Sequence, residues 1–202
     1  MKVKVYVEGA ARHSDLDRSL CREAFSKFFA AAGLEGKRPR TVPCGGRKQA
    51  YDLFLTAVKN AKADEFPILL VDSESAVSPG MTVWQHLKSR SGDNWDKPDR
   101  AADNQAFLMV QVMETWFVAD RELLKTFFGQ HFREQAIPVW PDLEQVPKLD
   151  VYDALSRATA GCGEKKYAKG RLSFDLLSRI SPAKVEDESP HAKAFLECLR
   201  NL

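Results

Sequence analysis

The chain has 202 residues, of which 44% are hydrophobic and 29% charged, and its formal net charge is +2, a composition typical of a globular domain with its own core. Its apolar runs fall far short of the roughly 20 residues that a membrane span needs, and its four cysteines lack the paired spacing of a zinc knuckle or a disulfide framework. The N-terminus also lacks the apolar segment of a secretory signal, so we expect a cytoplasmic protein with reduced thiols and no membrane contact.

The first 120 residues alternate between strand-like and helix-like patterns. In chain order, the apolar spacing predicts a strand at 2–7, a helix at 14–32, a weak strand at 38–44, a helix at 45–61, a strand at 67–72, and a strand at 107–112 that a helix follows. Ser14 should cap the first helix, Leu16 should lie on its apolar face, and Gly33 should end it. Because strands and helices alternate, we predict an α/β fold at 1–120, with a mostly parallel sheet flanked by helices.

Residues 75–106 interrupt this alternation with several prolines and glycines and one short helical stretch, VWQHLKS. Loops of this length inside compact domains are usually functional or disordered, and Trp84 and Trp95 argue against disorder. Two interpretations of this inserted loop stay open: a lid that contacts substrate, or a packed structural excursion.

From residue 121 onward the strand patterns vanish. Helical patterns, separated by proline-containing turns, occur at 121–128, 148–159, 171–180 and 190–200. We predict that residues 121–202 form a C-terminal helical lobe that packs on the sheet domain, so that the chain is one compact unit.

Acidic residues stand at the ends of three predicted strands. In chain order they are Glu8, Asp72, Glu74 and Glu114. Because ligands of parallel α/β sheets lie outside the carboxyl ends of the strands, these side chains should gather along one edge. Any one of them could instead cap the helix that follows, and Glu114 could be an ordinary first-turn acid. Their occurrence at three successive strand ends favours a shared site.

Clustered carboxylates repel one another unless protons or cations intervene, and hard oxygen ligands suit Mg²⁺ or Mn²⁺. A metal held there can activate a water and stabilise charge on a phosphodiester. The roles that we predict are metal ligand or general base for Glu8, metal ligand for Asp72 and Glu74, and further ligand or water-positioning residue for Glu114.

Two basic motifs are candidate substrate contacts. CGGRK opens the 45–61 helix, where Arg47 and Lys48 could hold a phosphate; a flexible turn with a solvated arginine is the alternative. KKYAKGR would place Lys169 at the scissile phosphate and Tyr167 on a base; the alternative is a basic loop.

Two weaker signals accompany these motifs. The acid-free set Lys37, Arg38, Arg40, Arg47 and Lys48 is either a nucleic-acid footprint or a solvated face. His86, in WQHLK, is a further candidate for substrate contact, although most isolated histidines serve packing or lie at the surface.

The strand-end motifs also occur in a known domain. YVEGA and LLVDSES resemble the Toprim domain of topoisomerases, primases, small maturation nucleases and overcoming-lysogenization-defect type nucleases. Together with WQHLKSR, WDKP, FLMVQVMETWFVAD and YAKGRLSFDLL, they look like the bacterial family of domain of unknown function 4276 over nearly the whole chain.

This resemblance implies a Toprim-like fold, with the Toprim glutamate at Glu8 and the acidic pair at Asp72 and Glu74. The second acid of the pair is Glu where Asp is commoner, which gives a longer reach to the same metal, so one metal or two stays open. In some relatives the resemblance also implies a place beside ATPase genes in anti-phage defence loci.

The resulting hypothesis is a Toprim-type nuclease, a Mg²⁺- or Mn²⁺-dependent phosphodiester hydrolase that acts on DNA or RNA. It would be the effector of an anti-phage defence system with an ATPase partner encoded nearby. The alternative is a non-catalytic Toprim-like module that binds a partner ATPase or a nucleotide signal. The choice between DNA and RNA, and self-association into a homo-oligomer, stay open.

Overall fold

The computed structural model describes residues 1–9 and 14–202. Within these residues, the centre of the protein is a sheet of four parallel strands in the order β2-β1-β3-β4. The strands are β1 (Lys2–Val7), β2 (Arg40–Pro43), β3 (Glu65–Asp72) and β4 (Ala106–Met109). The predicted α/β fold with a parallel sheet is therefore confirmed, and the arrangement is consistent with a Toprim-like fold.

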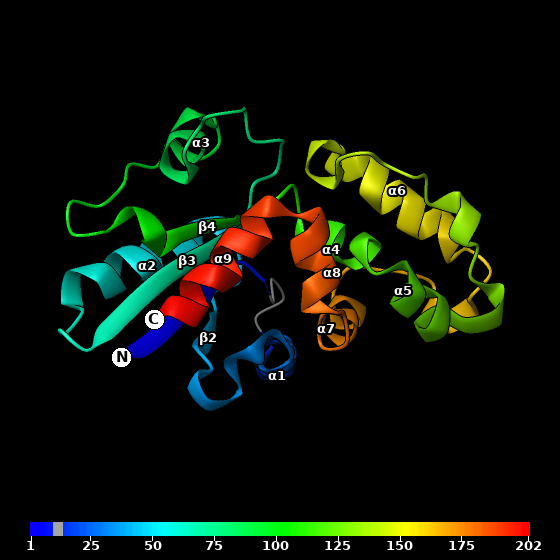
Figure 1. Cartoon of the computed structure of the whole chain (residues 1–202), viewed down its shortest axis with the longest axis horizontal. Coiled ribbons are helices and arrows are strands. Elements are labelled where there is room, and N and C mark those ends of the chain that lie inside the picture. Colours follow the sequence, from blue (N-terminus) through cyan, green and yellow to red (C-terminus); the bar gives the residue numbers. More distant parts are fainter. Residues whose placement is uncertain (10–13) are drawn as a thin grey trace.

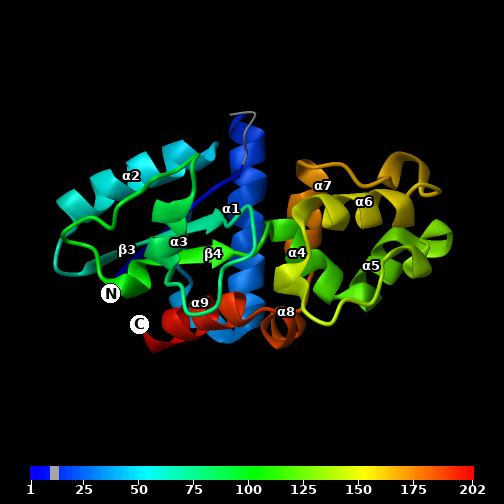
Figure 2. The ribbon, with the colours of Figure 1, turned by 90° about the horizontal axis from the view of Figure 1, so that it is seen from above.

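Helices cover both faces of the sheet (Figures 1 and 2). One face carries α1 (Asp15–Phe29) and α9 (Pro190–Asn201), and the other carries α2 (Arg47–Asn60) and α3 (Val83–Ser89). Alternate side chains of β3 feed the two cores: Ile68 and Leu70 are buried on the α1 side, and Leu69 and Val71 on the α2 side. A continuous apolar run is what a strand covered on both faces requires.

The first helix begins as predicted, because Ser14 Oγ accepts a hydrogen bond of 3.0 Å from the backbone nitrogen of Asp17. Its α-helical part ends at Phe29, and a wider π turn (Ala30–Leu34) follows, in which Gly33 adopts a φ of 84°. The prediction for Leu16 is wrong: this side chain is 50% exposed, so the buried face of α1 begins later in the helix.

The inserted segment at 75–106 packs against α2. Trp84 and Trp95 are each 7% exposed and Leu87 is fully buried. The Trp95 ring stacks on Tyr51 of α2, with ring centroids 4.4 Å apart. The inserted loop is therefore a packed part of the fold; whether it contacts a substrate is a separate question from this packing.

Short helices build most of the C-terminal part. They are α4 (Met113–Ala119), α5 (Arg121–Phe128), α6 (Lys148–Ala158), α7 (Arg171–Leu177) and α8 (Pro182–Glu188). The helix predicted after the last strand is divided in two, because the backbone of Asp120 leaves the helical region and its Oδ1 caps α5 by accepting a 3.1 Å bond from Leu123 N. The predicted end of the last strand at 112 is wrong, since β4 ends at Met109, and the sequence pattern does not predict α8.

The C-terminal helices contact the sheet domain as well as one another. α9 packs on β4 and α7 packs on α1 (Figure 2). Leu70 of the sheet and Leu155 of α6 belong to the same continuous cluster of buried apolar side chains. Within the described residues, no helix combines the length and the apolar character that crossing a bilayer demands.

Candidate functional site

Three of the predicted acids converge at the carboxyl edge of the sheet. Glu8, Asp72 and Glu74 each offer a carboxylate oxygen, and these oxygens lie within 4.8 Å of one another. They meet because β1 and β3 are neighbours in register, with Val7 paired to Leu70. The Glu8 amide extends this ladder by donating to the Leu70 carbonyl at 3.2 Å. The strand-end pattern therefore becomes a local cluster of negative charge.

The backbone beyond β3 is held in an unusual conformation at Glu74. This residue has a φ of 67°, a region that non-glycine residues seldom adopt. Its amide donates to the Gln111 carbonyl at 2.8 Å, and the preceding amide, of Ser73, donates to the Met109 carbonyl at 2.9 Å. The chain that follows β4 thus fixes the position of the third acid.

Burial and mutual repulsion shape the charge of the cluster. Asp72 is 6% exposed, and burial, followed by the charges of Glu8 and Glu114, raises the pKa of its carboxyl well above the usual value. Its Oδ1 still accepts a hydrogen bond of 2.9 Å from the backbone nitrogen of Met113. Burial also raises the pKa of Glu8, an effect that Arg47 opposes and Glu74 reinforces. The charged forms of Asp72 and Glu8 are therefore disfavoured without an added cation.

Among the described residues of the N-terminal half, Arg47 is the basic side chain that pairs with one of these acids. Gly9 and Gly45 form a two-way backbone bridge, with N···O distances of 2.9 and 2.8 Å, which ties the start of α2 to the end of β1. The Arg47 Nη1 lies 3.5 Å from Glu8 Oε2 and donates to the Asp72 carbonyl. Its Nε and Nη2 donate to the Asp93 carboxylate at 2.9 and 2.6 Å.

A second cation comes from the helical part of the chain. Lys148 is the first residue of α6, and its ammonium group donates a hydrogen bond to the Glu74 carboxylate. Burial raises the pKa of Glu74, but the hydrogen bond and the charge of Lys148 outweigh it, so the net pKa is lowered. The pKa of Glu74 is therefore lowered, whereas that of its buried neighbour Asp72 is raised.

Glu114 lies behind this cluster in a fully buried position. Its Oε1 accepts a 2.7 Å hydrogen bond from the Tyr167 hydroxyl. Its Oε2 has no hydrogen-bond partner among the described residues, and Lys169 Nζ lies 3.8 Å away. Lys169 also donates to the Tyr152 hydroxyl at 2.7 Å. Burial lowers the pKa of Lys169, but Glu114 and Tyr152 outweigh it and raise the net pKa. The predicted lysine thus lies at the edge of the acidic site and is ionised.

Two other predicted substrate contacts are buried. His86 is 3% exposed, and its Nε2 lies 2.9 Å from the Ser73 carbonyl, so it supports the backbone between two of the acids. Burial lowers its pKa, which favours the neutral ring. Tyr167 is 9% exposed and its hydroxyl contacts Glu114 and Ser173. The structure does not support stacking of Tyr167 on a base; it assigns both side chains to positioning.

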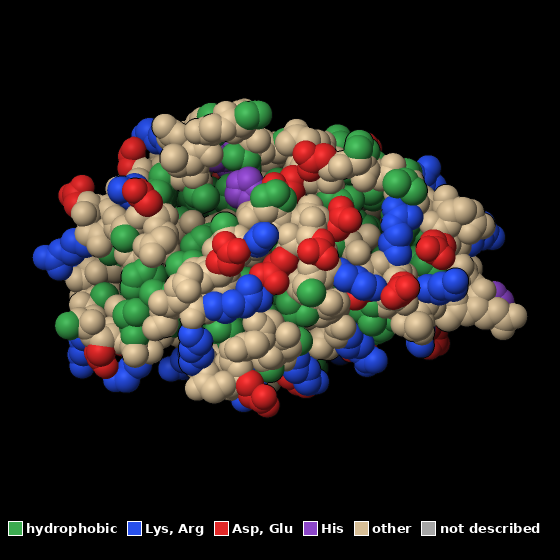
Figure 3. All heavy atoms as spheres, in the orientation of Figure 1, with side chains coloured by type: hydrophobic (Ala, Val, Ile, Leu, Met, Phe, Trp, Pro, Cys, Tyr) green, Lys and Arg blue, Asp and Glu red, His purple; other side chains and the backbone are tan. Residues whose placement is uncertain are grey.

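The predicted basic footprint is dispersed. Lys37 and Arg38 bond to groups of α9 and α1, respectively. The Lys48 side chain is 80% exposed and pairs with Asp52 one turn later at 2.8 Å, so it does not reach the acids. Figure 3 shows basic and acidic side chains interspersed over the face seen in Figure 1. Of this stretch, Arg47 is the member that lies at the carboxylates.

Three residues of the site are absent from the sequence prediction. Asp93, Lys148 and Tyr152 contact Arg47, Glu74 and Lys169. Asp93 lies between Gly92 and Trp95 in the inserted loop. An acid this close to a glycine and a tryptophan is a local signal that could have marked it as a candidate. Lys148 and Tyr152 lie in an ordinary amphipathic helix, and nothing in the local sequence distinguishes them.

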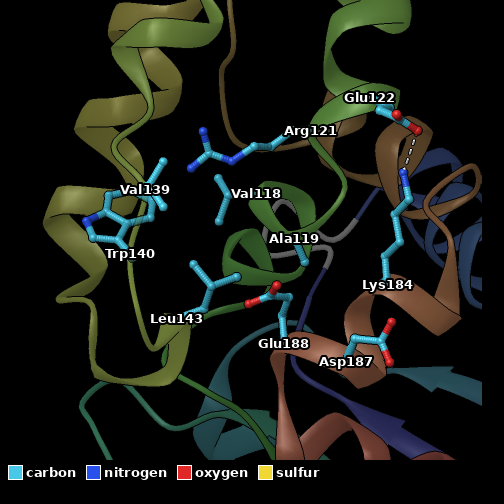
Figure 4. A pocket seen from close by; sticks show the side chains of 10 residues that line it. All are labelled: Val118, Ala119, Arg121, Glu122, Val139, Trp140, Leu143, Lys184, Asp187 and Glu188. Carbon is cyan, nitrogen blue, oxygen red and sulfur yellow. Dashed lines mark hydrogen bonds and ion pairs between the residues drawn. The ribbon is translucent and has the colours of Figure 1, made fainter.

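A cavity of about 390 Å³ lies in the helical part, away from the acids (Figure 4). Its walls come from α4, α5, α8 and the segment around Trp140, and they combine Val118 and Leu143 with charged side chains such as Arg121. An ion pair of 2.9 Å joins Lys184 and Glu122 at its rim. No predicted site residue lines this cavity, so the chemistry suggested by the acids does not depend on it.

Comparison with known proteins identifies one family. The family model described as a domain of unknown function (DUF4276) matches residues 7–200. No curated protein and no solved structure matches the chain. The matched range includes the four strand-end acids and Lys169, but the description of the family assigns them no activity.

Proposed function

The chain belongs to the family described as a domain of unknown function (DUF4276), and we propose that it is a Mg²⁺- or Mn²⁺-dependent phosphodiester hydrolase that acts on DNA or RNA. The observation that carries this proposal is the convergence of Glu8, Asp72 and Glu74 within 4.8 Å. Perturbed acids gathered at the carboxyl edge of a parallel sheet are a recurrent property of active sites.

The residues at this edge fit a hard divalent cation. Their donor atoms are all carboxylate oxygens, which Mg²⁺ and Mn²⁺ prefer. Burial and neighbouring acids raise the pKa of Asp72, so this carboxyl loses its proton readily only where a positive charge compensates. Glu114 Oε2 accepts no hydrogen bond from the described residues and lies 3.8 Å from Lys169 Nζ, so it is a further acceptor behind the three acids.

In this proposal each residue of the site has a definite role. Glu8, Asp72 and Glu74 would hold the ion, which when bound lowers the pKa of a water and stabilises charge on phosphate oxygens. The raised pKa of Glu8 suits it to accept a proton from an attacking water. Lys169, oriented by Glu114 and Tyr152, supplies positive charge where negative charge grows on the phosphate.

A second function has one observation in its favour. Lys148 pairs with Glu74, and Arg47 lies 3.5 Å from Glu8, so two of the three acids already have a cation from the protein. This arrangement suits a non-catalytic module in which the acids form structural ion pairs. Such a module would bind a partner ATPase or a nucleotide signal.

The biological setting of the proposal rests on the resemblance to the defence-associated family. We propose that the hydrolase is the effector of an anti-phage defence system whose ATPase partner is encoded nearby. An adjacent ATPase gene would support this setting, and its absence from the gene neighbourhoods of close homologues would remove the support.

The test combines binding and cleavage. Purified protein with millimolar Mn²⁺ should cleave labelled tRNA, single-stranded DNA or plasmid, and Mn²⁺ should raise its melting temperature, because a ligand at 100 times its Kd stabilises by about 2.7 kcal/mol. Asp72→Asn should lose both effects, whereas the exposed control Asp153→Asn should keep both. Indifference of the wild type to Mn²⁺ in both assays would favour the non-catalytic module.

A further inference from the structure

A second cavity, of about 350 Å³, opens next to the acids, where the chain leaves β3. The polar side chains of its wall are Ser75, Ser78, His86, Ser89, Arg90 and Ser91. Ser75 directly follows the acid Glu74, and Arg90 directly follows α3. The cavity wall therefore begins at the residue after the third acid, but no carboxylate lines the cavity among the described residues.

The hydroxyl groups of this wall are largely uncommitted. Across residues 1–9 and 14–202, the side chains of Ser75, Ser78 and Ser91 have no hydrogen-bond partner. Ser89 Oγ donates to the His86 carbonyl at 2.9 Å and keeps its acceptor capacity. Three hydroxyls are therefore free to donate to a ligand.

Arg90 adds a cation with unused donors. Its Nη1 donates to Asp93 Oδ2 at 2.7 Å, and its Nε and Nη2 have no partner among the described residues. Asp93 is shared, since Arg47 Nη2 donates to the same oxygen at 2.6 Å. One carboxylate thus faces two guanidinium groups, and of these Arg90 lines the cavity.

We propose that this cavity binds a further phosphate group of the substrate strand, beside the phosphate held at Glu8, Asp72 and Glu74. Free hydroxyls together with an arginine that has open donor positions are suited to a phosphate. Arg47 and Arg90 meet on Asp93, while Arg47 lies 3.5 Å from Glu8, so a chain of contacts connects the cavity wall to the acids. The assignment of a strand rests on the proposed hydrolase function.

The test measures binding without cleavage. A fluorescent single-stranded oligonucleotide is titrated into the full chain in EDTA at several salt concentrations. Arg90→Gln should weaken binding and reduce the slope of log K against log salt by about 0.7, the value for one phosphate contact on a single strand. Lys88→Gln, a neighbouring exposed lysine of α3 that pairs with Asp96, is the matched control and should leave the slope unchanged.

A second variant separates phosphate binding from any structural role of Arg90. Ser78→Asp places a negative charge on an exposed wall position and leaves the Arg90–Asp93 pair intact, so it should also weaken binding without changing the melting temperature. Wild-type affinity and slope in both Arg90→Gln and Ser78→Asp would overturn the proposal, as would a wild type that does not bind the oligonucleotide.

Further arms identify the source of the phosphate and separate the two proposals. Displacement of the oligonucleotide by a second oligonucleotide but not by AMP supports a strand, whereas equal displacement by AMP overturns the strand assignment in favour of a free nucleotide. Binding that depends on Arg90 without any Mn²⁺-dependent cleavage would retain the phosphate site and reject the hydrolase. Mn²⁺-dependent cleavage together with an unchanged salt slope in Arg90→Gln would retain the hydrolase and reject the phosphate site.

Discussion

Buried acids occur in two regions of the molecule, and their surroundings are opposite. In the helical region, Glu144 accepts hydrogen bonds from Ser189 Oγ at 2.5 Å, from the His191 amide at 3.0 Å and from the His191 ring at 2.6 Å. Burial raises the pKa of Glu144, but these bonds outweigh it and lower the net pKa. Asp120 is similar: the amides of Leu123 and Ser181 and the ammonium of Lys184 all donate to it.

At the sheet edge the acids face one another instead. Asp72 is surrounded by Glu8, Glu74 and Glu114, and its pKa is raised. Glu114 keeps one buried oxygen without a hydrogen bond among the described residues. The same fold therefore satisfies buried carboxylates fully in one region and incompletely in another.

This difference distinguishes two uses of a buried acid. Glu144 and Asp120 connect loops to helix ends, so their charges stabilise the native state. The sheet-edge acids gather charge that the native state disfavours, which is the arrangement expected where a ligand, and not the fold, completes the site. Three measurements test this distinction.

The largest effect should come from Lys169. If its ammonium serves the phosphate, Lys169→Ala should fold and bind Mn²⁺ as the wild type does but lose cleavage by about 100- to 1000-fold, the usual effect of removing one donor to a charged transition state. Lys165→Ala is the matched control, because Lys165 lies over the Phe127 ring and not at an acid, and it should retain activity. Full activity in Lys169→Ala would show that Lys169 serves only as a structural partner of a buried acid, as Lys184 does for Asp120.

The two regions should respond oppositely to neutralisation of one acid. Glu144→Gln should lower the free energy of unfolding by about 1–3 kcal/mol, because the donors that surround it lose a charged acceptor. Asp72→Asn, measured without metal, should leave the free energy of unfolding unchanged or raise it, since the repulsion from Glu8 and Glu114 disappears while the amide oxygen can still accept from Met113. Urea unfolding in EDTA measures both values. A destabilised Asp72→Asn would show that the sheet-edge acids serve the fold.

The smallest effect is a difference in pH dependence without metal. The folded pKa of Asp72 is raised above 3.8, so its contribution to stability is complete below the unfolded value and is lost as pH rises through the raised pKa. For Asp120, burial raises the pKa, but Lys184 and two amides outweigh it and the net pKa is lowered; its contribution is present above 3.8 and lost as pH falls through the lowered pKa.

Thermal unfolding in EDTA from about pH 3 to about pH 8 tests these signs, with at most about 1.4 kcal/mol per pH unit for each group. Asp72→Asn should flatten the loss of stability toward neutral pH, and Asp120→Asn should flatten the loss toward acid pH. If both variants flatten the acid side, the two acids have the same environment and the comparison fails.

Local sequence patterns were enough to predict where the strands lie and that Glu8, Asp72 and Glu74 lie at or just after the carboxyl ends of two of them. Continuous apolar runs and helical spacing are local patterns, and the alternation of strands and helices predicts a parallel sheet, whose strands end at one edge. The strand order β2-β1-β3-β4, which puts β1 beside β3, belongs to the fold and brings Glu8, Asp72 and Glu74 together. The short helix in the inserted loop was also readable, since VWQHLKS corresponds to α3 residue by residue.

The partners of these acids, by contrast, depend on the tertiary structure. Arg47 meets Asp93 across 46 residues, Glu114 meets Tyr167 across 53, and Glu74 meets Lys148 across 74. Lysines, arginines and tyrosines of this kind occur throughout the chain, and no local pattern distinguishes the ones that reach the acids. Their selection depends on the path of the inserted loop and on how the helical part docks on the sheet, and both are set by the packing of Trp84, Trp95 and the shared apolar core. Packing between distant segments is non-directional, so its result is a property of the whole fold and not of any stretch of the sequence.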